Sequence, residues 1–152
     1  MVEDNPLLAL EQDQQQTAVL IEVQLPIQNN NIGAITRALD TAIENAGKAT
    51  VENQRPWLLI RFLPLTENNR IRSDFGACNT LESYLSSPSL TRRCRTVAIL
   101  DGKYADHVIL PLLSCSKLIV SPETSISGPE SDTSLLTSEV KDDYRRVAEA
   151  HK

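Results

Sequence analysis

Aromatic side chains are scarce in this chain of 152 residues, where Phe, Trp and Tyr together make up 4%. Apolar residues of all kinds still account for 41%, which is a normal share for a globular protein. We therefore expect a core of Leu, Ile, Val and Ala. A chain of this length buries enough surface to fold as one domain without a metal or a disulfide.

Motifs that would identify a cofactor or a metal site are absent as well. The three cysteines (Cys78, Cys94 and Cys115) show no CxxC or metal-type spacing, and their odd number gives no disulfide framework. The five glycines form neither GxGxxG nor a Walker motif. The sequence thus predicts no cofactor and no metal, and it favours Cys78 and Cys115 as small buried side chains because they lie in apolar helical patterns.

The chain also lacks a long apolar run and an excess of positive charge. No stretch of 18 apolar residues occurs, so membrane association would require segments outside this chain. The formal net charge is −5, which argues against a nucleic-acid partner because phosphate backbones bind concentrated Lys and Arg. The only basic cluster, at 92–95, is typical of a solvated turn. The cellular compartment is left open.

Four short apolar runs alternate with helical patterns along the chain. The runs cover residues 17–27, 57–63, 96–100 and 117–120. This alternation predicts an α/β fold with a mostly parallel sheet built from repeated strand–helix units. A buried helix is expected to begin near Asp106 and pack against the sheet.

The ends of the chain differ from its centre. Residues 1–16 are polar and Gln-rich, which predicts a flexible N-terminal arm before a domain at 17–152. An amphipathic helical pattern begins at Ser138 and continues almost to the last residue. We expect from this ending that the domain was excised from a longer protein.

The stretch from Thr96 to Gly128, TVAILDGKYADHVILPLLSCSKLIVSPETSISG, resembles the centre of the ClpP/crotonase superfamily. Upstream, RPWLLIRFLP followed by DFGACNTLESYLSS is similar to the second strand and helix of that group. The resemblance covers residues 17–150 and is closest to the NfeD-type, ClpP-class membrane-bound serine protease domains. It implies a ClpP/crotonase-like fold, a homo-oligomer and a membrane-anchored prokaryotic parent protein.

The same resemblance implies where a peptidase site would lie. The nucleophile, a serine in the peptidases, corresponds to Asp106, and the substrate groove would be lined by His107, Ser125, Ser127 and Gly128. A carboxylate at a helix start stays ionised and is expected to cap the helix. It cannot attack as an activated hydroxyl does, and its charge repels an oxyanion. Asp106 therefore marks a degenerate nucleophile position.

No base for a serine nucleophile is evident either. The loop at 126–131 contains no histidine. Lys141 is the only lysine in the final helix, and its neighbours Asp142 and Asp143 favour its protonated form. The sequence therefore leans against an enzyme.

Three functions remain open. The first is a degenerate protease-like domain that acts in binding, assembly or regulation, with a peptide or protein partner. It would self-associate through the region of the final helix. The second is a working peptidase whose serine lies elsewhere, for example at Ser114 or Ser116. The third is a crotonase-like acyl-CoA enzyme, which the lack of paired Gly-rich loops makes the weakest.

Overall fold

The computed structural model describes residues 16–50, 54–66, 71–127 and 138–150. Its main sheet is parallel throughout, with the spatial order β1-β2-β3-β5. These strands are β1 (Ala18–Gln24), β2 (Trp57–Leu63), β3 (Arg95–Leu100) and β5 (Lys117–Val120). The α/β fold with a mostly parallel sheet is therefore confirmed. The predicted arm lies outside the described residues except for Gln16.

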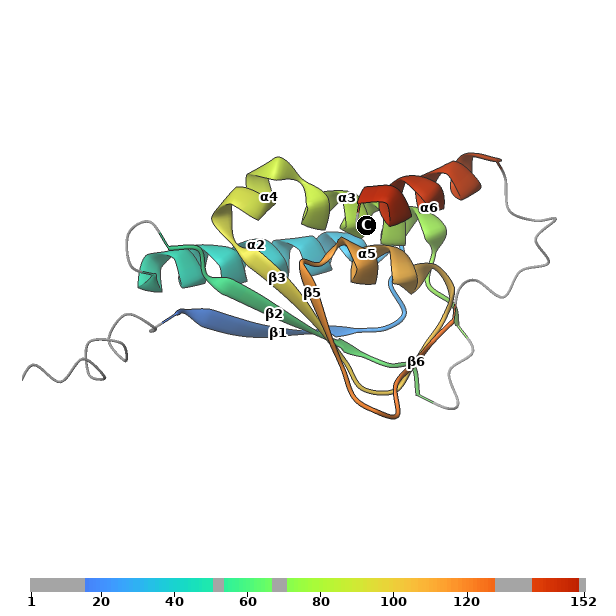
Figure 1. The fold of residues 1–152 in the computed structure, drawn as a ribbon, viewed down its shortest axis with the longest axis horizontal. Coiled ribbons are helices and arrows are strands. Elements are labelled where there is room, and N and C mark those ends of the chain that lie inside the picture. The colour runs from blue at the N-terminus through green and yellow to red at the C-terminus, as the bar shows by residue number, and fades with distance from the viewer. Residues whose placement is uncertain (1–15, 51–53, 67–70, 128–137, 151–152) are drawn as a thin grey trace, which may run out of the picture.

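Helices connect the strands and gather on one side of the sheet (Figure 1). They are α2 (Ile32–Ala49), α3 (Phe75–Ser86), α4 (Pro88–Arg93), the 3₁₀ turn η1 (Asp106–Val108), α5 (Ile109–Ser114) and α6 (Ser138–Ala150). Two very short strands, β4 (Lys103–Tyr104) and β6 (Ser125–Ile126), pair in parallel beyond the carboxyl ends of β3 and β5. This arrangement places the loops that follow β3 and β5 side by side.

The helices bury one face of the sheet. Side chains alternate between faces along a strand, and Leu58, Ile60 and Phe62 of β2 all point towards the helices with 1% exposure or less. The opposite face, which carries Leu20 of β1 and Ile119 of β5, is termed the open face below. Each of these two residues is 55% exposed. The described part of the chain thus forms two layers rather than three.

The open face holds a cation–aromatic cluster. Trp57 lies in register with Arg95 of the neighbouring strand. The Arg95 guanidinium and the Lys117 ammonium each lie 5.2 Å from the centre of the Trp57 ring. Such contacts let charged side chains cover an aromatic surface while their charges stay in water.

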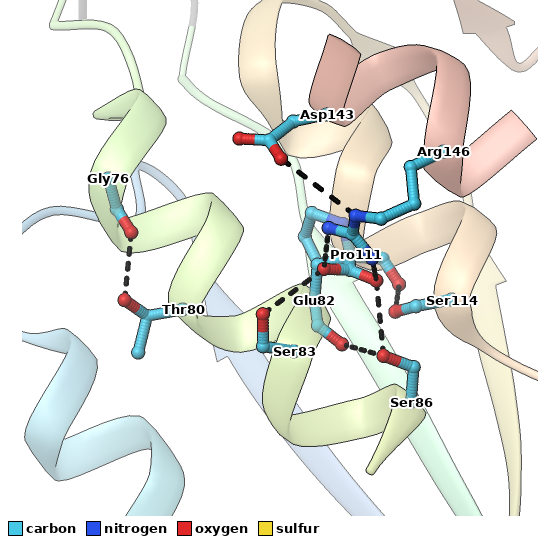
Figure 2. Close-up of polar contacts among 9 residues, drawn as sticks. All are labelled: Gly76, Thr80, Glu82, Ser83, Ser86, Pro111, Ser114, Asp143 and Arg146. Atoms are coloured by element: carbon cyan, nitrogen blue, oxygen red, sulfur yellow. Dashed lines mark hydrogen bonds and ion pairs between the residues drawn. The ribbon is translucent and has the colours of Figure 1, made fainter. Parts of the chain in front are cut away.

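A buried carboxylate holds α6 against α3 (Figure 2). The Glu82 side chain is 2% exposed, and its Oε2 lies 3.1 Å from Nη2 of Arg146. The Ser86 hydroxyl donates to Oε1 at 3.1 Å, and the Ser83 hydroxyl donates to Oε2 at 3.3 Å. Val147, 1% exposed, adds apolar packing one residue further along α6. The position of the last helix therefore depends on one polar network as well as on burial.

We expect Arg146→Ala to destabilise the protein by about 1–3 kcal/mol, because it leaves the buried Glu82 carboxylate without its cation. The half-exposed guanidinium is partly screened by water, which keeps the loss below that of a fully buried pair. Arg145→Ala is the matched control, since its pair with Asp142 is about 70% exposed and worth at most about 0.5 kcal/mol. Urea unfolding measures both, and equal losses would contradict the assigned role of Glu82.

Candidate functional site

A cavity of about 310 Å³ opens beside the short β4–β6 pair. It lies where the loops after the strands of the main sheet converge, which is where ligands bind in parallel α/β sheets. The lining residues are Leu25, Leu65, Ser73, Lys103, Tyr104, Ala105, Asp106, Ser125 and Ser127. The structure therefore brings Asp106, Ser125 and Ser127 of the predicted groove to one cavity.

Tyr104 fixes the wall of this cavity. Its side chain is 2% exposed, and its hydroxyl donates to the Phe62 carbonyl at 2.6 Å and accepts from the Asp101 N–H at 3.0 Å. Burial raises the pKa of the Tyr104 phenol, so the hydroxyl remains a donor at neutral pH. One side chain thus ties the ends of β2 and β3 to β4.

A cluster of hydroxyls holds the next turn. Ser121 Oγ donates to Asp101 Oδ1 at 2.8 Å and lies 2.8 Å from Thr124 Oγ1. Thr124 Oγ1 donates to the Leu100 carbonyl at 3.1 Å. Asp101 is not among the residues that the sequence predicts for the site. Polar residues directly after two neighbouring parallel strands were the signal that could have revealed the cluster.

Asp106 does not cap the helix, and the prediction that it would is wrong. Residue 105 is the N-cap of η1, and no side-chain capping bond forms there. Asp106 is itself the first residue of the turn and has a left-handed backbone, with φ 63°. Its carboxylate instead lies 3.7 Å from Nη1 of Arg72 and is 14% exposed. Tertiary contacts rather than the helix terminus therefore hold this charge.

His107 lies outside the cavity lining. Its Nδ1 is 2.8 Å from the Tyr144 hydroxyl, and its ring meets Phe75 edge-on at 5.3 Å between centroids. Burial lowers the pKa of His107, and the neighbouring Asp106 only partly opposes this effect. The imidazole is therefore neutral near pH 7 and links η1 to α6.

The cysteines offer no alternative nucleophile. All three are buried. Burial raises the thiol pKa of Cys94 to about 11 and those of Cys78 and Cys115 to about 12. Because only the thiolate attacks, these groups are inert in the folded protein, and the prediction that Cys78 and Cys115 are buried is confirmed.

The cavity contains hydroxyls and charges but no histidine among its described residues. Ser73 is 7% exposed and its Oγ accepts the Ile27 N–H at 3.0 Å. Lys103 and Asp106 are the cavity's charged side chains. Gly128 lies outside the described residues, as does the side chain of Lys141. This set can bind polar groups, but it offers its serines no histidine as a base.

Two further searches cover only the described residues. No helix within them has the length and apolarity that a membrane crossing requires. No group of three or more His, Cys, Asp or Glu side chains within them gathers as a metal site does.

Comparison with known proteins identifies no family for this chain. No protein-family model, curated protein or solved structure significantly matches this chain. The resemblance to ClpP-class domains therefore stays a prediction.

The left-handed backbone of Asp106 predicts a difference between two substitutions that both remove the carboxylate. Glycine adopts this conformation freely, whereas an L side chain without a polar group is penalised by about 1–2 kcal/mol. We expect Asp106→Gly to be more stable than Asp106→Ala by about 1 kcal/mol in urea unfolding. Greater stability of the alanine variant would contradict the left-handed geometry.

The lowered pKa of His107 predicts a dependence of stability on pH. The unfolded histidine, with a pKa near 6.5, takes up a proton before the folded one does. Its contribution is therefore complete above pH 6.5 and is lost as the pH falls towards the lower folded value. We expect the stability of the wild type to decline below pH 6.5 more steeply than that of His107→Gln. Parallel profiles in pH-dependent urea unfolding would refute this.

Proposed function

We propose that this chain is a degenerate ClpP-class serine-protease-like domain that binds an extended peptide segment and does not cleave it. The observation that carries the proposal is Asp106, which stands in the cavity wall where the resemblance assigns the nucleophile. A four-stranded parallel sheet with helices between its strands is compatible with a ClpP/crotonase-like fold. The proposal keeps the membrane-anchored prokaryotic parent protein that the resemblance implies.

The surroundings of Asp106 argue against catalysis. Its carboxylate, 3.7 Å from Nη1 of Arg72, occupies the place where an oxyanion would have to be stabilised, and like charges repel. His107, the only histidine in the described residues, is engaged by Tyr144 away from the cavity. A hydroxyl without a neighbouring base is a weak nucleophile.

The backbone beside the cavity favours binding of an extended segment. The Ser125 N–H donates to the carbonyl of Gly102, just before β4, at 3.0 Å, and the Ser127 N–H donates to the Tyr104 carbonyl in β4 at 2.9 Å. Because backbone groups alternate in direction along a strand, those of Ile126 point away from β4. Ile126 is also 41% exposed. A peptide strand could pair with this edge while its side chains enter the cavity, which is recognition by strand addition.

A working peptidase is the second candidate, and one observation favours it. Lys103 and Ser125 are register partners in the β4–β6 pair, and both line the cavity. A lysine base must be neutral, which requires burial or neighbouring cations. Lys103 is exposed to solvent and therefore lacks the burial that a lysine base needs.

We expect no digestion of casein above background and no labelling by a fluorophosphonate probe. A peptidase that has lost its nucleophile accelerates the reaction only roughly 10³–10⁴-fold over the rate in water. Asp106→Ser should not restore cleavage, because no base is placed to accept the proton. Digestion by the wild type that disappears in Ser125→Ala, Ser114→Ala or Ser116→Ala would overturn the proposal and favour the active peptidase.

Binding is tested with the same intact chain. A library of labelled, unstructured peptides is screened by fluorescence polarisation, and any ligand is measured again with Ser125→Trp, which fills the cavity. Ser89→Trp is the control, since Ser89 is exposed on α4, away from the cavity lining. Loss of binding in Ser125→Trp alone supports the proposed site. Equal effects of the two substitutions, or no bound peptide at all, would count against it.

A further inference from the structure

Exposed apolar side chains gather at one edge of the molecule. Within the described residues, six large hydrophobic side chains are at least 40% exposed, and four of them lie on β5 and β6: Leu118, Ile119, Val120 and Ile126. β5 ends the strand order of the main sheet, and all four of its residues are exposed. An edge strand of this kind is a template for pairing with another strand.

The outer side of β5 presents backbone groups at two defined positions. The Ser121 N–H donates to the Leu100 carbonyl at 3.0 Å, so the odd-numbered residues of this segment direct their backbone groups towards β3. The N–H and C=O groups of Leu118 and Val120 consequently point outwards. No described strand pairs with that side of β5.

The usual protection of an edge strand is missing here. Natural sheets place charged side chains, especially lysine, along exposed edges. The one charged residue of β5, Lys117, reaches back across the sheet to within 5.2 Å of the Trp57 ring centre. The three residues that follow it, Leu118 to Val120, carry no charge.

We infer that β5 is a self-association edge, on which the β5 strand of a second copy of this chain pairs in antiparallel orientation about a twofold axis through Ile119. Residues opposite each other in an antiparallel pair point to the same face, which restricts the registers allowed. With Ile119 opposite its own copy, Leu118 lies opposite Val120 on the helix side. The outward backbone groups of Leu118 and Val120 then hydrogen-bond to each other in both halves of the pair.

This register explains why the partner is a second copy. Every apolar residue of β5 meets an apolar residue, and Lys117 meets Ser121, so no like charges are opposed. The result is one continuous sheet of eight strands, four from each copy. The edge is distinct from the cavity, so this assembly is independent of peptide binding. A contact of four residues is small, and we expect a weak dimer that responds to concentration.

The test substitutes the residue on the axis. In sedimentation equilibrium, the mass of the intact wild-type chain should rise from 16.8 kDa towards twice that value as concentration increases. Ile119→Lys and Ile119→Glu should each remain at 16.8 kDa, because like charges meet across the axis. An equimolar mixture of the two variants should dimerise again, since Lys then faces Glu.

Leu20→Lys is the matched control, because Leu20 is equally exposed on the opposite edge strand, β1. It should dimerise as the wild type does. A monomeric wild type at every concentration would overturn the inference. Dimers of the separate Ile119 variants, a mixture that stays monomeric, or a dimer broken by Leu20→Lys would do so as well. Circular dichroism confirms that each variant is folded.

Discussion

Helices cover only one face of the parallel sheet, and the rest of this structure depends on that constraint. Parallel sheets are usually buried on both faces. Here the helices bury one face, while Leu20 and Ile119 on the other are 55% exposed. The core is consequently concentrated between the strands and the helices α2, α3 and α5, and α6 packs on α3 and α5 rather than on the sheet. A buried Glu82–Arg146 pair and the apolar contact of Val147 hold it instead.

The cavity is likewise a product of how the parallel strands end. The carboxyl ends of β3 and β5 lie side by side, so the polar residues that follow them meet. The hydroxyl of Tyr104 joins the ends of β2 and β3 by two hydrogen bonds, and the turn at 121–124 closes the arrangement. Rigid positioning by buried groups lets this small domain present serines and an aspartate at one cavity.

The strands could be predicted from the sequence because each contains a short apolar run, although the residues of β5 turn out to be exposed at the sheet edge. The details of the site could not. The left-handed backbone of Asp106 and its contact with Arg72 are set by tertiary packing across 34 positions of chain, which periodicity does not report. His107 was expected to line the groove, but the structure places its ring against Tyr144 of α6. That direction depends on where the last helix packs, so local sequence carries no signal for it.

The cluster around Trp57 gives the molecule an optical property. This residue is the only tryptophan of the chain, and it lies on the open face with two cations 5.2 Å from its ring centre. Indole emission responds to nearby charge and to water. Because the chain has one tryptophan, its entire tryptophan fluorescence comes from this surface. A molecule that covers this face, or a salt that loosens Arg95 and Lys117 from the ring, is expected to shift the emission wavelength of Trp57 without an added label. The chain thereby carries its own reporter on the side of the sheet that its helices leave bare.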